Sequence, residues 1–169
     1  MIMKFFKKQG KFLIFLFALG LFLFLFAFPF KIQGNSMQNT FQNNDRIIVS
    51  RLLSKFNLLK RGDVIVCKFD SKSIIKRIIA LPGEHIIIYD NLVKVNNNIL
   101  DEPYVINSTD GKIDLILAED EYFIMGDNRI TSYDSRNFGP IKKSCIEAKV
   151  LLKIFPSLAF VNFNYNNLN

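Results

Sequence analysis

Two hydrophobic patterns divide the chain. Residues 12–30 read FLIFLFALGLFLFLFAFPF, 19 positions without a charged side chain, between Lys11 and Lys31. Beyond Lys31 the apolar residues come in short runs separated by Gly, Asn and Asp. A long uncharged run is typical of a helix that spans a membrane, whereas short runs between turn residues are typical of strands. The sequence therefore predicts one N-terminal transmembrane helix followed by a β domain.

The length of the apolar run favours a permanent membrane anchor over a cleaved signal peptide. At about 1.5 Å per residue, a helix over residues 12–30 is roughly 28 Å long, close to the thickness of a bilayer's hydrocarbon core. A signal peptide has a shorter apolar core, of about 7–15 residues, with a small-x-small cleavage site after it. The segment Phe28 to Ile32 contains no such site.

The charges around the run predict its orientation. Four lysines precede it and one follows closely: Lys4, Lys7, Lys8, Lys11 and Lys31. The positive-inside rule then makes residues 1–11 a basic cytoplasmic N-terminus, 12–30 a single-pass anchor and 31–169 an extracytoplasmic domain. The net charge is +7, and beyond these lysines the basic residues are scattered, with no stripe interleaved with aromatic residues. Binding to nucleic acid is therefore not expected.

The short apolar runs predict a mainly antiparallel β domain, curled or barrel-like. Strands are expected within residues 45–53, 62–69, 73–80, 85–89, 90–100, 117–128 and 146–155, with turns at Asp90-Asn91 and Asn96 to Asn98. No segment with the helical period follows the anchor. The apolar tail, residues 155–169, is expected to pack on the sheet, or else to lie on the bilayer surface, where aromatic side chains are favoured.

Residues suited to metal or redox chemistry are few. Cys67 and Cys145 either pair in an oxidising compartment or are two small buried apolar residues. The single histidine, His85, follows the turn signal LPGE and is typical of a solvent-facing turn rather than of a Ser-His-Asp system. One histidine and two distant cysteines do not make a usual zinc site, so neither a metal nor another cofactor is predicted.

Lys76 stands out because it lies inside the apolar segment SIIKRIIA. On a strand it shares one face with Ile74 and Ile78, so burial of that face also buries the amine. A free lysine titrates near pH 10.4 and is protonated at neutral pH, whereas loss of solvation disfavours the charged form and lowers the pKa. Lys76 is therefore either a candidate general base or a lysine whose stem covers apolar surface while its amine stays in water.

Two further segments carry candidate chemistry. Ser36 lies in KIQGNSMQNTF directly after the apolar run, and Gly34, two positions earlier, allows backbone N–H groups to approach a developing oxyanion. Residues 126–140 read GDNRITSYDSRNFGP, with two acids, two arginines and three small hydroxyl residues. That density suits a rigid hydrogen-bonded loop, which either positions a base or is a well-bonded turn.

In this order, these segments resemble the type I signal peptidases, the membrane-bound serine proteases that release signal peptides. The resemblance runs from about residue 28 to 156. The segment NSMQNT resembles the family's nucleophile segment, and IKRIIALPGE resembles its lysine segment. The segment RGDVIVCKF is similar to a family strand that follows a Gly-Asp turn, and MGDNRITSYDSRNFGP is similar to the last family segment. DEPYV and KIFP are also similar to family segments.

The resemblance implies catalytic roles at the matched positions. Ser36 is expected to attack the scissile carbonyl, with neutral Lys76 as general base and the Ser36 backbone N–H, with Gly34, at the oxyanion. Supporting residues are expected at Ser132, which would orient the lysine amine, and in the ion pairs Asp127–Arg77 and Asp134–Arg136. A shallow apolar pocket for small substrate residues is expected to be lined by Phe30, Ile32, Phe41 and Ile75.

The resemblance also implies a setting. The expected fold is a β catalytic core with a small β insertion, here reduced to residues 84–121. The expected location is the bacterial cytoplasmic membrane, with the catalytic domain outside. The expected partners are signal peptides of exported preproteins, membrane lipid and the secretion translocon.

The sequence departs from the family pattern at two positions. Asn39 stands where proline is usual; since proline stiffens a loop and asparagine does not, a looser turn is expected there. Gly34 stands where some members carry a serine that adds an oxyanion donor. Three alternatives remain open: a non-catalytic anchored homologue, for which Asn39 is the one hint, a maturation peptidase dedicated to one substrate, and a self-cleaving Ser-Lys regulator, which would need a DNA-binding module.

Overall fold

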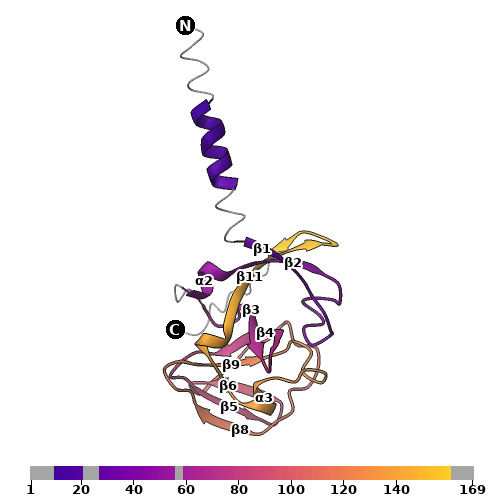
Figure 1. Ribbon diagram of the computed structural model, residues 1–169. Coiled ribbons are helices and arrows are strands. Elements are labelled where there is room, and N and C mark those ends of the chain that lie inside the picture. The colour runs from indigo at the N-terminus through magenta and orange to yellow at the C-terminus, as the bar shows by residue number, and fades with distance from the viewer. Residues whose placement is uncertain (1–9, 21–26, 56–58, 161–169) are drawn as a thin grey trace.

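A computed structural model of the protein describes residues 10–20, 27–55 and 59–160. Most of the predicted cytoplasmic segment 1–11, part of the predicted anchor and the end of the tail lie outside the described residues. The described β domain consists of two antiparallel sheets connected through the strands β4 (Lys72–Ala80) and β9 (Glu121–Met125) (Figure 1).

The main sheet carries the strand order β1–β2–β11–β3–β4–β9–β10, and β12 pairs with β11. Its strands are β1 (Ala27–Lys31), β2 (Arg46–Ser50), β3 (Val64–Phe69), β4 (Lys72–Ala80), β9 (Glu121–Met125), β10 (Ile141–Lys142), β11 (Ile146–Phe155) and β12 (Ala159–Phe160). Every pair is antiparallel, which confirms the predicted fold class. Within the described residues β1 and β10 are unpaired edges, so the sheet stays open, and the barrel-like closure predicted as one option is wrong.

The segment between β4 and β9 forms the second sheet, with the order β7–β6–β5–β8. Its strands are β5 (His85–Tyr89), β6 (Leu92–Val95), β7 (Asn98–Ile99) and β8 (Ile113–Ile116). Two-residue turns join the first three strands, and both turn residues have positive φ in each: Asp90 (54°), Asn91 (64°), Asn96 (50°) and Asn97 (68°). Asn and Asp tolerate this conformation better than other residues with a side chain, which is why these positions were readable as turns.

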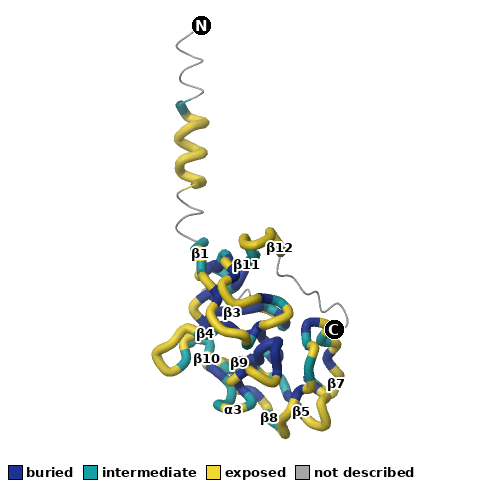
Figure 2. The backbone as a smooth tube through the Cα atoms, turned by 90° about the vertical axis from the view of Figure 1, so that its right-hand side faces the viewer, coloured by how far each residue is buried: buried dark blue, intermediate teal, exposed yellow. Residues whose placement is uncertain are grey.

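Three apolar clusters fill the domain, and β4 contributes to all of them. Ile75 belongs to the cluster under β1 and β2, Ile79 to the one between the main and second sheets, and Ile78 to the one beside β10. The last six residues of β4 are buried, including Lys76 and Arg77. The buried strands therefore run through the middle of the domain, surrounded by exposed turns (Figure 2).

Short helices lie between the strands at three places that the sequence did not indicate. The predicted strand 45–53 ends at Ser50, where α2 (Arg51–Lys55) begins. α3 (Ser135–Phe138) lies in the 126–140 loop, and its N-cap Asp134 forms a capping box with Asn137. A short 3-10 helix, η1 (Lys143–Cys145), precedes β11. These helices are too short for a recognisable period, so their formation depends on capping and tertiary contacts.

Residues 27–30, which the sequence analysis assigned to the end of the anchor, lie in β1 and pair with β2, so that part of the prediction is wrong. Phe28 and Phe30 are half-buried and pack against the core of the main sheet. This packing removes apolar surface from water, as insertion into a bilayer would. Residues 10–20 form a helix whose apolar side chains are exposed. Among the described residues, no helix has both the length and the hydrophobicity to span a membrane.

Candidate active site

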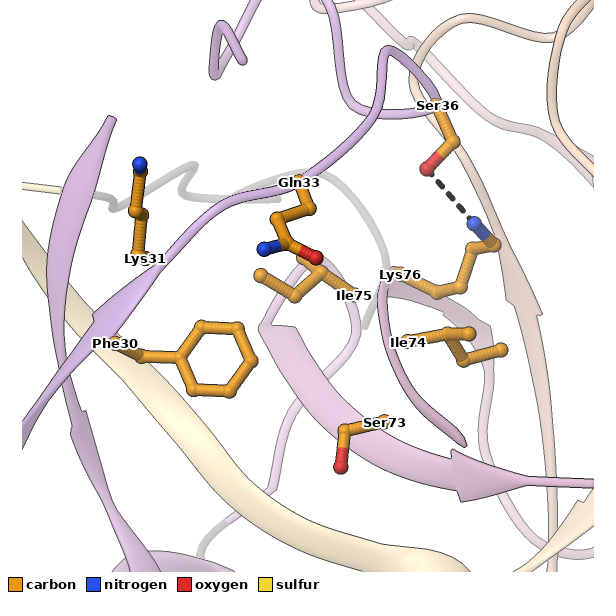
Figure 3. Close-up of a pocket in the computed structure, with 8 residues that line it drawn as sticks. All are labelled: Phe30, Lys31, Gln33, Ser36, Ser73, Ile74, Ile75 and Lys76. Atoms are coloured by element: carbon orange, nitrogen blue, oxygen red, sulfur yellow. Dashed lines mark hydrogen bonds between the residues drawn. The ribbon is translucent and has the colours of Figure 1, made fainter. Parts of the chain in front are cut away.

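Ser36 and Lys76 meet although 40 positions separate them in the sequence. Ser36 lies in the turn that follows β1, and Lys76 lies in the middle of β4. The Lys76 Nζ donates a hydrogen bond of 2.8 Å to the Ser36 Oγ, and both side chains point into the same open cavity (Figure 3). A hydroxyl and an amine in direct contact are the minimum that base-assisted attack by serine requires.

The Lys76 amine is held where its charge is disfavoured. The side chain is buried on β4, with 4% of the residue exposed. Loss of solvation is the largest effect and lowers the pKa of Lys76 below the ordinary 10.5; Arg136 acts in the same direction, while Asp134, Cys67 and Asp127 act against it. Among the candidate readings of Lys76, the one with the amine in water therefore disagrees with the structure.

The nucleophile turn, residues 34–41, is held by buried side chains and by the loop opposite it. Met37 and Phe41 are 2% and 1% exposed and belong to the core cluster below the turn. The Ser36 carbonyl accepts a hydrogen bond of 3.0 Å from the backbone N–H of Asn128. In the described part of the chain, no hydrogen bond uses the Ser36 backbone N–H, which leaves it available to a ligand at the cavity.

Gly126 allows this close approach of turn and loop. A Cβ added at Gly126 would lie 2.4 Å from the Ser36 carbonyl oxygen and 2.3 Å from the Ser132 Oγ. Real Cβ atoms do not approach other atoms so closely, so any other residue at this position would push the turn and the loop apart. The glycine that opens the 126–140 loop is therefore required by packing at Ser36.

The Gly34 backbone N–H is not free to serve an oxyanion in this structure. Gly34 has a φ of 92°, which suits glycine, and its N–H donates to the Asn43 Oδ1 at 3.1 Å. Of the two oxyanion positions expected from the sequence, only Ser36 offers an unused N–H. Gly34 instead shapes the entry to the nucleophile turn.

Arg77 and Asp127 form a buried ion pair directly behind Lys76. Arg77 Nε and Nη2 donate to Asp127 Oδ1 and Oδ2 at 2.8 and 2.6 Å, and both side chains are 0% exposed. The Thr40 hydroxyl donates to Asp127 Oδ2 at 2.5 Å, and Arg77 also donates to the Gly62 carbonyl at 2.7 Å. The pair thus connects β4, the 126–140 loop and the nucleophile turn.

The second expected pair, Asp134 and Arg136, shapes the loop itself. Arg136 Nε donates to Asp134 Oδ1 at 2.9 Å, and Asp134 Oδ2 accepts the Gly126 backbone N–H at 2.9 Å. Ser132 lies beside Gly126, but its buried Oγ has no hydrogen-bond partner among the described residues. The expected bond from Ser132 to the Lys76 amine is therefore not formed in this structure.

The open cavity beside Ser36 and Lys76 has a volume of about 430 Å³. It lies between β1 and β4 and is lined by Phe30, Lys31, Gln33, Ser36, Ser73, Ile74, Ile75 and Lys76 (Figure 3). A second cavity of about 270 Å³ shares Phe30 and Ser73 with it. Of the predicted pocket residues, Phe30 and Ile75 line the cavity, whereas Ile32 and Phe41 are buried in the core and do not.

Comparison with known proteins decides the family. The family model described as "Signal peptidase, peptidase S26" matches residues 6–155. The chain belongs to the signal peptidase family. It is 35% identical to signal peptidase I V of Bacillus subtilis over 133 residues, covering 69% of this chain and 79% of that protein. It is 33% identical to signal peptidase I of Bacillus caldolyticus over 145 residues, covering 76% and 80%.

A solved structure agrees with this assignment. The crystal structure of a signal peptidase I from Enterococcus faecalis matches with a TM-score of 0.51 and 28% identity, covering 54% of this chain and 95% of that one. The resemblance inferred from the sequence motifs is therefore confirmed, as is the prediction that the chain is a peptidase.

The structure adds residues to this signal peptidase site that sequence reasoning did not assign. The side chains of Thr40 and Tyr104 both contact Arg77: Thr40 accepts from Arg77 Nη2 at 3.1 Å, and the Tyr104 ring lies 4.0 Å from the guanidinium carbon. Arg129 pairs with Glu102 at 2.6 Å and donates to the Gly126 carbonyl at 3.0 Å. These residues lie in the segments NSMQNT, DEPYV and MGDNR, which the sequence analysis had already singled out. No sequence pattern, however, indicated which side chains would contact one another.

Asn39 does not loosen the nucleophile turn, contrary to the expectation from the sequence. Its φ is 97°, and its Nδ2 donates to the Tyr104 carbonyl at 2.8 Å. Proline holds φ near −65°, so it does not fit this backbone conformation. At this position a hydrogen bond to the core therefore holds the turn where the family usually has a proline ring.

Elsewhere the signal peptidase domain shows little redox or metal chemistry. Cys67 is buried, which raises the pKa of its thiol to about 12, and Cys145 is half-buried; both are free. The His85 Nε2 lies 2.6 Å from the Asp114 Oδ1 on the second sheet, and neither residue lines the cavity. Within the described residues no three His, Cys, Asp or Glu side chains are grouped for a metal ion.

Proposed function

We propose that this protein is a membrane-bound serine endopeptidase that removes signal peptides from exported proteins, with Ser36 as nucleophile and neutral Lys76 as general base. The single observation that supports the proposal most is the 2.8 Å contact between the Ser36 Oγ and the buried Lys76 Nζ. Within a family whose relatives are named signal peptidase I, this contact supplies the two groups that acyl transfer to serine needs.

The chemistry follows from the protonation states of these two groups. In the neutral state of Lys76, the hydroxyl donates to the amine, which takes its proton as the Ser36 Oγ attacks the scissile carbonyl carbon. The negative charge that develops on the carbonyl oxygen is stabilised by the Ser36 backbone N–H. The ammonium of Lys76 then gives its proton to the leaving amine, the peptide C–N bond breaks, and an acyl ester on Ser36 remains.

Hydrolysis of the ester completes the cycle with the same residues. Neutral Lys76 accepts a proton from a water molecule that attacks the ester carbonyl, and the proton returns to the Ser36 Oγ as the acyl C–O bond breaks. The products are the signal peptide with a free carboxylate and the mature protein with a free amine. No step requires a group that the chain does not carry.

The cavity favours small substrate side chains next to the scissile bond. An extended peptide lying between β1 and β4 would place its side chains against Phe30 and Ile75. Ile75 belongs to the same core cluster as the buried Ile32 and Phe41, and Phe30 packs against that cluster, so a close-packed core limits the depth available to a side chain. This supports cleavage after small-x-small sequences such as Ala-x-Ala.

The uncharged run before β1 would hold the enzyme at the cytoplasmic membrane, with the β domain on the extracytoplasmic side. Lysines before the run, at positions 4, 7, 8 and 11, support that orientation. Ser36 follows the last residue of β1 by five positions, so the site would lie near the lipid and the translocon, where a signal peptide presents its cleavage site.

A cleavage assay tests the proposed function. Full-length protein in detergent micelles is mixed with a preprotein that carries an Ala-x-Ala site, and the products are identified by mass spectrometry. We expect one cut after the second alanine by the wild-type protein and none by the Ser36→Ala variant. Equal cleavage by the two proteins, or none by either, would contradict the proposal.

The rate of cleavage is expected to rise with pH over a range in which an ordinary lysine is still protonated. Burial lowers the pKa of Lys76 below 10.5, so the neutral amine that accepts the serine proton accumulates as the pH rises toward that lowered pKa. The pH dependence of kcat/KM for the free enzyme measures it. An acid limb with its midpoint at or above 10.5 would exclude Lys76 as the base.

A further inference from the structure

Asn39 has a backbone conformation that few residues adopt. Its φ is 97°, which costs energy for any residue with a Cβ and is tolerated best by Gly, Asn and Asp. This conformation lets the chain reverse within the nucleophile turn, where the backbone N–H groups of Thr40 and Phe41 both donate to the Met37 carbonyl, at 3.1 and 2.8 Å. The conformation of Asn39 therefore determines how the turn closes.

The Asn39 side chain also joins the turn to a distant segment. Its Nδ2 donates to the Tyr104 carbonyl at 2.8 Å, across 65 positions of sequence. Tyr104 is 2% exposed, and its ring lies 4.0 Å from the guanidinium carbon of Arg77, the residue next to Lys76 on β4. The acceptor is therefore part of the rigid core behind the lysine.

Tertiary hydrogen bonds hold the turn around Ser36 on both sides of Met37; besides the three named next, the Asn128 Nδ2 donates to the Gln38 Oε1 at 3.3 Å. The Ser36 carbonyl is bonded to the Asn128 N–H, the Thr40 hydroxyl to Asp127, and the Asn39 amide to Tyr104. The first acts on one side of Met37, and the other two act on the other side. Small displacements of a nucleophile from its base slow the reaction strongly, so the loss of one of these bonds is expected to cost turnover.

From these contacts we infer that Asn39 is a positioning residue: its amide, on a left-handed backbone, holds the nucleophile turn against Tyr104 and so aligns Ser36 with Lys76. This inference rests on the proposed role of Ser36. Asn39 touches neither the cavity nor the reacting atoms, so its effect is on the geometry of the turn and not on the chemistry itself.

The exposure of Asn39 makes the inference testable apart from stability. Asn39 is exposed, and substitutions at exposed positions usually change stability little. Asn44 provides a matched control, because it is exposed, has a φ of 74° in the same connection between β1 and β2, and makes no side-chain hydrogen bond within the described residues. Glycine at either position keeps the backbone conformation and removes only the side chain.

The experiment compares full-length Asn39→Gly and Asn44→Gly with wild type in the preprotein assay, together with their thermal unfolding midpoints. We expect Asn39→Gly to lower kcat about three- to tenfold, the loss that one hydrogen bond produces, with KM changed less than twofold. We expect Asn44→Gly to keep both constants. Asn39→Pro, which cannot adopt the left-handed φ, is expected to lower kcat further than Asn39→Gly.

The outcomes separate this inference from the proposed function. Cleavage by wild type but not by Ser36→Ala supports the proposed function and does not bear on the role of Asn39. If wild type is active and Asn39→Gly keeps its kcat, or Asn39→Pro is as active as wild type, the inference is wrong and the function stands. If Asn39→Gly lowers the unfolding midpoint but keeps kcat per folded molecule, Asn39 is only structural and the inference is likewise overturned.

Discussion

Replacing Lys76 by alanine is expected to lower kcat for preprotein cleavage by about 10²–10⁴-fold, the usual contribution of a general base. The reason is geometric as well as electrostatic: the Lys76 Nζ is the group that contacts the Ser36 Oγ, at 2.8 Å, and burial favours its neutral form. Within the described residues no histidine lies beside Ser36 to replace it. The measurement is single-turnover cleavage by purified full-length variants.

Two control variants make the Lys76 result specific. Lys76→Met keeps the apolar stem and removes the buried amine, so it is expected to be as inactive as Lys76→Ala but at least as stable as wild type. Lys72, at the exposed start of β4, is four residues away on the same strand, and Lys72→Ala is expected to keep wild-type activity. Activity retained by Lys76→Met would remove Lys76 from the mechanism.

Replacing Asp127 by alanine is expected to destabilise the fold by about 3–5 kcal/mol, because it removes the carboxylate whose negative charge balances the buried Arg77 guanidinium. Arg77 and Asp127 are both 0% exposed, and Asp127 also accepts the Thr40 hydroxyl. Chemical denaturation of the wild-type and variant proteins measures the change in the free energy of unfolding.

An exposed ion pair on the same domain provides the comparison. Lys142 and Asp120 lie 3.8 Å apart, with 66% and 59% of their side chains exposed. Asp120→Ala is expected to cause no measurable change, since water already solvates both charges. The double variant Arg77→Met/Asp127→Ala removes both buried charges, so its loss of stability should be smaller than that of Asp127→Ala alone. If the double variant instead loses more stability than Asp127→Ala, packing and not charge dominates at this site.

Local pattern determined much of the fold. β5 and β11 begin and end at the predicted residues, because β-branched and apolar runs between turn residues favour strands wherever they occur. The motifs likewise indicated Ser36, Lys76 and the members of both ion pairs, because each of these residues lies in a contiguous segment that resembles a family motif. β8, with its four residues, escaped prediction, as did the two-residue strands β10 and β12, because short segments carry little periodicity.

The sequence by itself determined the family and the antiparallel β class, and it indicated the two residues proposed to react, because each is carried by local composition and order. Only the tertiary structure decided that residues 27–30 form a strand, since hydropathy does not distinguish burial in a core from burial in lipid. It also decided that Ile32 and Phe41 are buried in the core and do not line the cavity, that the buried Ser132 Oγ has no hydrogen-bond partner among the described residues, and that Asn39 bonds to Tyr104. Asn39 and Tyr104 are 65 positions apart, and no local pattern specifies which distant partner a side chain will meet.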